Sequence, residues 1–177
     1  RGFLGIGGRK DDTKGFGGGV AYADGKLYVS SGFRFVAQLD AATGKENWRQ
    51  ATSTPVHAAP TVVDGRVFVV STDNELLTFA AGDGTPGWTY QALIEPARIL
   101  GGSSPAVSGD TVVAGFASGE LVALRTGNGN DLWSEALSRA SRTNALSEIR
   151  DIAGRPVIYK VDVYAVSHSG VFAATDL

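Results

Sequence analysis

Apolar and polar residues alternate in short stretches along the chain, and turn residues separate the stretches. Between Thr61 and Ala80, for example, the segments "TVV", "RVFVVS" and "LLTFA" carry this alternation, and the pair Asp64-Gly65 joins the first two. A period of two predicts β-strands. Asp-Gly favours a type I′ hairpin, because both central residues of that turn need positive φ. The pattern therefore predicts a β-meander.

The same meander recurs along the sequence. The repeated units are "VAYADGKLYVSSGFRFVAQLDAATGKENW" from Val20, "PTVVDGRVFVVSTDNELLTFAAGDGTPGW" from Pro60, "PAVSGDTVVAGFASGELVALRTGNGNDLW" from Pro105 and "PVIYKVDVYAVSHSGVFAATDL" from Pro156. The second unit follows the first by 40 residues, and the third follows the second by 45. A glycine and a tryptophan stand at matching places in the first three units: Gly44 and Trp48, Gly84 and Trp88, and Gly129 and Trp133. The chain is therefore built of repeats.

A single meander of this length cannot cover both of its faces, so neighbouring units must stack. We therefore predict an all-β fold, a β-propeller of tryptophan-docked repeats with about four blades present. The predicted units are residues 1–19 as a connection or partial blade, 20–59, 60–104 and 105–155 as repeats, and 156–177 as a partial repeat. An insertion over 136–155 makes the fourth unit lag behind the third by 51 residues.

The recurring tryptophans are interpreted as structural residues. Each is a large flat side chain at one repeated site, which suits the space between adjacent blades better than a ligand-stacking role. An open half ring would leave the faces of its first and last blades uncovered. We therefore expect either association between chains or a larger parent protein.

Composition narrows the possible functions. The chain has no cysteine, so disulfides, thiolate metal sites and cysteine nucleophiles are excluded. Its 24 glycines are dispersed, as expected for many tight turns between short strands. The net charge of −2 comes without a basic stripe, which argues against nucleic acid as a partner. No apolar run approaches the length of roughly 20 residues that a membrane helix needs.

Candidate catalytic residues are few. The two histidines, His57 and His168, are isolated in turn-like segments, where a structural or solvated role is the usual one. There is no Gly-x-Ser-x-Gly sequence, and the glycine runs near the start of the chain lack the following helix that a phosphate-binding loop needs. The sequence predicts a protein that is not an enzyme and that uses neither a cofactor nor a metal.

The first repeat carries a family resemblance. Leu39, Asp40, Thr43, Gly44 and Trp48 resemble the tryptophan-docked repeat of quinoprotein, or PQQ-like, propellers. Later units keep the glycine and the tryptophan but replace the aspartate and the threonine. The repeat spacing, with the segments "EPARILGGSSPAV" and "SRTNALSEIRDIAGRPVI", is similar to that of the BamB family of outer-membrane protein assembly factors.

The resemblance implies a function. BamB proteins are eight-bladed, non-catalytic scaffolds of the outer-membrane β-barrel assembly machinery. They lie in the periplasm at the inner leaflet of the outer membrane and are held there by a lipidated N-terminal cysteine, a residue that this chain lacks. They bind the periplasmic POTRA domains of BamA and assist the folding and insertion of outer-membrane proteins, whose unfolded chains are further candidate partners.

The resemblance also places an interface on the two non-repeat segments. The residues that carry it are Arg98, Ile99, Leu100, Ile149, Arg150 and Asp151. Apolar side chains beside charged ones are typical of a protein interface. The alternative is that the aliphatic side chains tuck under their own loops.

Two other functional classes share the propeller repeat. A PQQ-dependent dehydrogenase would need a quinone and a calcium ion held by acidic residues, and the candidate acids here are Asp110, Glu120 and Asp162, at ordinary turn or surface positions. A ligand-sensing propeller domain is the third class. The sequence leaves both open as alternatives to the scaffold.

Overall fold

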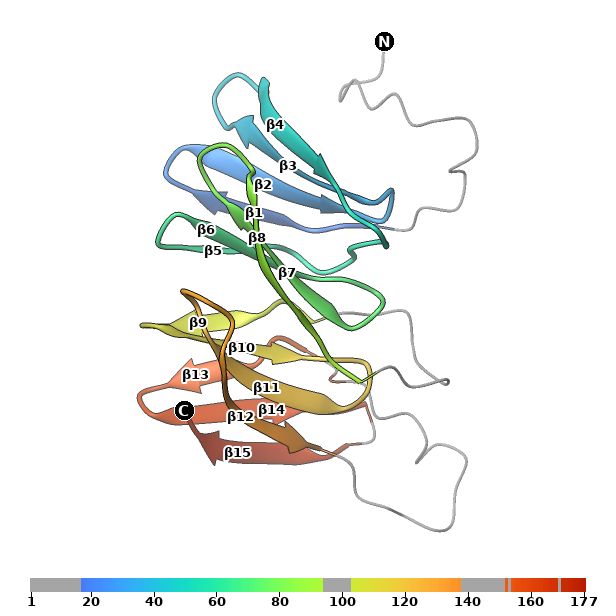
Figure 1. Ribbon diagram of the computed structural model, residues 1–177, viewed down its shortest axis with the longest axis vertical. Helices are drawn as coiled ribbons and strands as arrows, with labels where there is room; N and C mark the ends of the chain where they lie inside the picture. Colours follow the sequence, from blue (N-terminus) through green and yellow to red (C-terminus); the bar gives the residue numbers. More distant parts are fainter. Residues whose placement is uncertain (1–16, 94–102, 138–151, 153, 169) are drawn as a thin grey trace.

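The computed structural model describes residues 17–93, 103–137, 152, 154–168 and 170–177. Within these residues the chain forms four antiparallel sheets, in each of which neighbouring strands follow one another in sequence. The four sheets are stacked face to face along the long axis, with the first and the fourth at opposite ends (Figure 1). No helix long and apolar enough to cross a membrane occurs in this part of the chain.

The strands have the following bounds. The first sheet contains β1 (Val20–Ala23), β2 (Lys26–Ser31), β3 (Phe35–Asp40) and β4 (Glu46–Ala51). The second contains β5 (Thr61–Val63), β6 (Arg66–Val70), β7 (Glu75–Ala80) and β8 (Pro86–Gln91). The third contains β9 (Ala106–Ser108), β10 (Thr111–Gly115), β11 (Glu120–Arg125) and β12 (Asp131–Ala136). The fourth contains β13 (Val157–Tyr159), β14 (Asp162–Val166) and β15 (Phe172–Asp176).

The first hairpin of each sheet depends on its turn residues. Asp24 and Gly25 both have positive φ, at 48° and 73°, and Asp64 and Gly65 repeat this with 49° and 70°. The type I′ requirement predicted for these two turns is thereby confirmed. In the fourth sheet Lys160 occupies the corresponding turn with a φ of 57°, so a residue other than aspartate or glycine adopts the left-handed conformation there.

The outermost strand of the first three sheets is the element that the apolar pattern did not predict. In β4, which pairs with β3, only Trp48 is buried and the neighbouring side chains are polar and mostly exposed. β8 and β12 repeat the arrangement with Trp88 and Trp133, which are half-buried. The sequence shows three apolar segments per unit, but the structure adds a fourth, mostly polar strand, because the rim of the stack faces solvent.

Three apolar clusters fill the spaces between consecutive sheets. The cluster between the first and second sheets includes Tyr28, Val36, Val67, Val69 and Phe79. The cluster between the second and third includes Phe68, Val70, Leu76, Val112, Phe116 and Leu124. The cluster between the third and fourth includes Val113, Leu121, Ala123, Val163 and Ala165. The middle strands of the two internal sheets, β6, β7, β10 and β11, therefore send alternate side chains into two different clusters.

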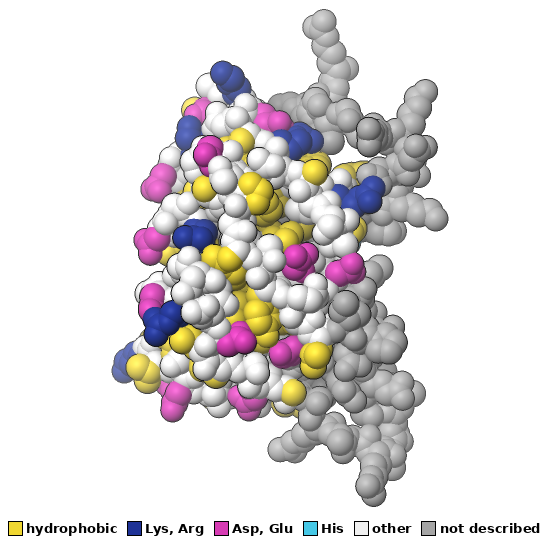
Figure 2. Space-filling model, viewed as in Figure 1, with side chains coloured by type: hydrophobic (Ala, Val, Ile, Leu, Met, Phe, Trp, Pro, Cys, Tyr) yellow, Lys and Arg dark blue, Asp and Glu magenta, His cyan; other side chains and the backbone are white. Residues whose placement is uncertain are grey.

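The innermost strands contact one another in order: β1 touches β5, β5 touches β9, and β9 touches β13. In a propeller, consecutive meanders pack face to face, and the first strand of each lies next to the first strand of the following one. The four sheets have this arrangement. Charged side chains of both signs are interspersed over the face shown in Figure 2, with apolar side chains between them. The surface is consistent with the small net charge of −2.

Candidate functional site

All six residues predicted to form the interface lie outside the described residues: Arg98, Ile99, Leu100, Ile149, Arg150 and Asp151. The structure does describe the residues at which the segments 94–102 and 138–151 leave the sheets and return to them. These flanking residues define where on the molecule the two segments are attached.

Segment 94–102 is attached beside the turn that joins β10 to β11. Before the segment, the backbone N–H of Leu93 donates to Oε2 of Glu120 at 3.2 Å. After it, the hydroxyl of Ser103 donates to the carbonyl oxygen of Gly115 at 3.0 Å. The Ser103 hydroxyl is buried, and this bond satisfies it. Both ends of the segment are thus bonded to residues that border one turn.

Segment 138–151 is attached to the same turn. Before it, the N–H of Leu137 donates to the carbonyl of Gly119 at 2.8 Å. After it, the N–H of Ile152 donates to the carbonyl of Phe116 at 3.2 Å, and the Ile152 side chain is buried. A Cβ added to Gly115 would lie 2.6 Å from Cγ2 of Ile152, so only glycine fits at this contact. The four attachment points of the two segments therefore converge on residues 115–120.

Asn74 joins this turn to the second sheet. Its buried side-chain amide donates to the carbonyl of Leu93 at 2.7 Å and accepts the N–H of Ala117 at 3.1 Å. Asn74 also has a φ of 59°, which asparagine tolerates better than most residues. The apolar pattern of the sequence gives no signal for Asn74; the only local sign is that Gly119 takes the matching place, also with positive φ, in the third sheet.

The recurrent tryptophans and glycines meet across neighbouring sheets. The indole N–H of Trp48 donates to the carbonyl of Ala81 at 3.0 Å, and that of Trp88 donates to the carbonyl of Thr126 at 2.9 Å. A Cβ added to Gly84 would lie 2.6 Å from Cε3 of Trp48. Gly129 stands in the same relation to Trp88, at 2.5 Å. Trp48 and Trp88 thus each pack against the glycine of the following unit.

The two ends of the series differ from its middle. Trp133 packs against the apolar cluster between the third and fourth sheets, but its buried indole N–H has no hydrogen-bond partner among the described residues. Gly44, in the first sheet, has a φ of 70°, yet a Cβ added to it would meet nothing within 4 Å. The contact between tryptophan and glycine is therefore described at two of the sheet junctions.

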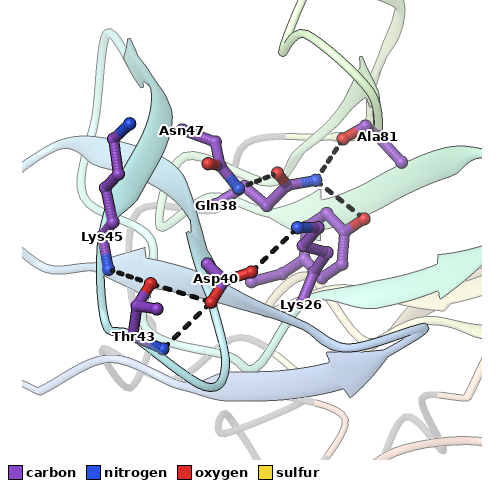
Figure 3. A network of polar contacts seen from close by, with 8 residues as sticks. Lys26, Gln38, Asp40, Thr43, Lys45, Asn47 and Ala81 are labelled. Carbon is purple, nitrogen blue, oxygen red and sulfur yellow. Dashed lines mark hydrogen bonds and ion pairs between the residues drawn. The ribbon is translucent and has the colours of Figure 1, made fainter.

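The loop that contains Gly44 is held by a polar network (Figure 3). Oδ1 of Asp40 accepts the Thr43 N–H at 2.9 Å and the Thr43 hydroxyl at 2.8 Å, while Oδ2 pairs with Lys26 Nζ at 3.1 Å. The Thr43 hydroxyl and then the Lys26 ammonium lower the pKa of Asp40 to about 2, because both stabilise the ionised carboxylate. This network explains why aspartate and threonine occur together in the first unit.

The other two units hold the same loop differently. Asp83 accepts the N–H of Thr85 at 2.9 Å, and Asn128 accepts the N–H of Asn130 at 3.1 Å. The bond from Thr85 lowers the pKa of Asp83. In these two units the side-chain oxygen that holds the loop comes from the residue directly before the glycine. In the first unit it comes from Asp40, four residues before Gly44. The departures from the repeat pattern therefore keep the loop geometry.

A second polar contact joins the first two sheets beside Trp48. The side-chain amide of Gln38 is buried; it donates to the Tyr28 hydroxyl at 3.0 Å and to the same Ala81 carbonyl that accepts the Trp48 indole. Asn47 donates in turn to Oε1 of Gln38 at 2.8 Å. Figure 3 shows Gln38 between Asn47 and Ala81. Ala81 thus receives two donors from the preceding sheet.

The candidate chemical residues are dispersed. His57 is half-buried and His168 is exposed. Asp110 pairs with Arg125 at 2.6 Å, and Asp162 accepts the hydroxyl of Tyr164 at 3.4 Å. Glu120 is used in the attachment of segment 94–102, as described above. Within the described residues no three His, Cys, Asp or Glu side chains are grouped as metal ligands, and these acids do not form the donor set that a quinone–calcium site needs.

The sequence matches a known family over nearly its whole length. The family described as outer membrane protein assembly factor BamB matches residues 6–177. The chain belongs to the BamB family. The resemblance inferred from the repeats and the two non-repeat segments is thereby confirmed.

Individual relatives are about a quarter identical to the chain over the residues that align. The outer membrane protein assembly factor BamB of Moranella endobia is 27% identical over 160 residues, which cover 90% of the chain and 41% of that protein. BamB of Yersinia pestis gives the same identity and the same coverage. The chain therefore spans about two fifths of the length of these curated relatives.

Solved structures confirm the fold class. The crystal structure of BamB from Moraxella catarrhalis superposes with a TM-score of 0.81 and 25% identity, covering 90% of the chain and 49% of that protein. The predicted all-β propeller is therefore confirmed as part of a larger propeller fold. A quinohemoprotein alcohol dehydrogenase of Pseudomonas putida HK5 superposes with a TM-score of 0.58 at 15% identity, which is a likeness of fold alone.

Proposed function

We propose that the chain acts as a non-catalytic scaffold in the outer-membrane β-barrel assembly machinery and that it does so by binding the periplasmic POTRA domains of BamA. Membership of the BamB family carries this proposal. The protein would work in the periplasm, at the inner leaflet of the outer membrane, and a lipid anchor would hold it there. Its contribution to the folding and insertion of outer-membrane proteins would come from binding alone.

The binding surface in this proposal consists of segments 94–102 and 138–151. The described residues that flank both segments are bonded to residues 115–120, and this convergence supports a joint role. Asn74 and Ile152, both buried, give that turn firm support. A partner that binds beside residues 115–120 would thus be close to the described ends of both segments.

The chemistry of the segments suits a protein partner. Ile99, Leu100 and Ile149 would supply the apolar contacts that lose water on binding, and Arg98 and Arg150 would supply a charged rim. Asp151 would meet a basic residue of the partner. A charge pair at a partly desolvated interface contributes to specificity and to the rate of association.

Isothermal titration against the purified POTRA domains tests the proposal. We expect binding by the 177-residue chain and a loss of at least about tenfold in affinity for Asp151→Arg, since reversing one charge of an interface pair costs more than 1 kcal/mol at such positions. Asp131→Arg is the matched control: it makes the same charge change at an exposed residue at the start of β12, the end of that strand away from segment 138–151.

The two variants distinguish an error in the proposed binding site from an error in the proposed function. An affinity unchanged by Asp151→Arg would remove this residue from the interface while leaving the scaffold role in place. An affinity lowered equally by Asp131→Arg would indicate a general charge effect. Absence of binding by chains whose circular dichroism shows a folded β-protein would contradict the proposed function.

A further inference from the structure

The loop between β11 and β12 contains a chemically labile pair of residues. Asn128-Gly129 is the one Asn-Gly pair in the sequence. The backbone nitrogen that follows an asparagine can attack the side-chain amide carbon, and glycine hinders this attack least because it has no Cβ. Asn128 is exposed, so the water that the reaction consumes has access to it. The pair is therefore a candidate for covalent modification without an enzyme.

The modification has two steps and needs only water. In the first step, the backbone nitrogen of Gly129 bonds to Cγ of Asn128, the Cγ–Nδ2 bond breaks, and ammonia leaves with the proton of the backbone nitrogen. In the second step, water opens the cyclic imide. Opening at Cγ gives aspartate. Opening at the main-chain carbonyl carbon gives isoaspartate, in which the main chain runs through the side chain and is longer by one methylene group.

The folded loop holds both of the groups that react. The N–H of Gly129 donates to the carbonyl of Arg125 at 2.9 Å, and Oδ1 of Asn128 accepts the N–H of Asn130 at 3.1 Å. The nitrogen of the cyclic imide carries no hydrogen, so the bond from Gly129 to Arg125 has to break before the ring closes. Ring closure therefore requires the loop to open, and opening loses at least this hydrogen bond.

Trp88 of the second sheet keeps the same loop closed. Its indole N–H donates to the carbonyl of Thr126 at 2.9 Å, and a Cβ added to Gly129 would lie 2.5 Å from Cε3 of its ring. The loop is thus packed and hydrogen-bonded across the junction between the second and third sheets. Any local opening that frees the N–H of Gly129 also disturbs these contacts.

We propose that Asn128 is a site of spontaneous deamidation and that the opening of this loop away from Trp88 sets its rate. The two products differ in their effect on the junction. Aspartate is tolerated, because Asp83 stands at the matching place in the second unit and accepts a backbone N–H at 2.9 Å in the same manner. Isoaspartate lengthens the main chain directly before Gly129 and shifts the glycine that the Trp88 ring contacts. Formation of isoaspartate therefore weakens the junction.

The matching loops of the other two units are resistant. Thr43 stands before Gly44 and has no side-chain carbonyl carbon that could be attacked. Asp83 stands before Gly84, but an ionised carboxylate reacts poorly with a nucleophile, and the bonded N–H of Thr85 lowers the pKa of Asp83 and so keeps it ionised. Among the three matching loops, modification is expected in the third.

Peptide mapping by mass spectrometry after incubation in mildly alkaline buffer tests the proposal. The folded chain is compared with the chain unfolded in guanidinium chloride. We expect Asn128 to convert before any other asparagine in both samples, and at least about tenfold faster in the unfolded chain, because the contacts that hold the loop are lost there. Electron-transfer fragmentation distinguishes isoaspartate from aspartate.

Two tryptophan variants separate opening of this loop from opening of the whole chain. Trp88→Phe and Trp48→Phe each remove an indole N–H that is bonded to a carbonyl of the following unit. We expect Trp88→Phe to raise the rate of conversion in the folded chain about fivefold, the factor that corresponds to one hydrogen bond. Trp48→Phe is the matched control and should leave the rate unchanged. Circular dichroism verifies that both variants are folded.

Three outcomes would overturn the proposal. Equal rates in the folded and unfolded chains would remove the loop from control of the reaction, and this comparison needs no variant. Equal acceleration by the two tryptophan variants would assign the rate to global unfolding. An isoaspartate form, separated by chromatography, that unfolds at the same urea concentration as the unmodified chain would show that the junction is not weakened; Asn128→Asp is the control and is expected to unfold with the unmodified chain.

Discussion

The second and fourth sheets carry the same face in two different settings. Leu76 and Phe172 occupy matching places, yet Leu76 is fully buried and Phe172 is 66% exposed. Both side chains are apolar, and the strands that carry them pair in the same antiparallel manner. The difference lies in the presence of a third sheet over the second. In a stack of repeats, the sequence of a unit decides which side chains can be buried, and the neighbouring unit decides which ones are.

The largest expected effect comes from truncating these two side chains. Leu76→Ala should lower the free energy of unfolding by about 3 kcal/mol, because it leaves a cavity in a closed cluster. Phe172→Ala should cost less than about 1 kcal/mol when the chain is monomeric, since most of the side chain already contacts water. Urea unfolding followed by tryptophan fluorescence measures both values. Equal costs for the two variants would contradict this comparison, because they would mean that the side chain of Phe172 is covered as fully as that of Leu76.

A smaller effect is expected at the repeated glycines. Gly84→Ala should destabilise the chain by about 2 kcal/mol, because it adds left-handed backbone strain at a φ of 75° and forces a methyl group against the Trp48 ring. Gly44→Ala should cost only about 1 kcal/mol, because its φ of 70° gives the strain without a contact. Thermal unfolding measures the loss of stability in both variants. Gly84 contacts Trp48 across a junction between two sheets, and Gly44 has no such contact. Similar losses would mean that backbone strain alone accounts for the cost at Gly84.

The smallest effect concerns the loop at Gly44. Asp40 has its pKa lowered from 3.8 to about 2, so its ionised form stabilises the folded state above pH 4 and this contribution is lost as the pH falls toward 2. Thr43→Ala removes the principal donor and should move the pKa of Asp40 back toward its ordinary value. Carbon-detected NMR titration of the Asp40 carboxyl measures the shift. A pKa that stays near 2 in the variant would assign the effect to Lys26 instead.

The fold could be predicted from the sequence because its strongest patterns are local. Asp24-Gly25 and Asp64-Gly65 specify their hairpins, and the recurrence of Trp48 as Trp88 fixes the length of the unit. The outermost strands could not be predicted from the same pattern. In β4 only Trp48 is buried, because the strand lies at the rim of the stack, where its other side chains are not covered by the described residues.

The candidate site was harder to derive than the fold. The two segments were identifiable, since both interrupt the repeat spacing, but the residues that attach them were not. Ile152 gives no periodic pattern, and the need for glycine at Gly115 arises only because Ile152 approaches it from a distant part of the sequence. The roles of Glu120 and Asn74 likewise depend on contacts across sheets, which local patterns do not specify.

The pairing of each indole with the glycine of the next unit has a consequence for how such a chain grows during evolution. A unit that carries both the tryptophan and the glycine supplies one of the two contacting residues at each of its boundaries. Duplication or deletion of a whole unit therefore recreates the same contact between the units that become neighbours. Replacing Trp48 alone would instead leave Gly84 without the ring that it accommodates. Change by whole units is therefore easier to tolerate than change at either residue, and the tryptophan and the glycine are expected to be inherited together.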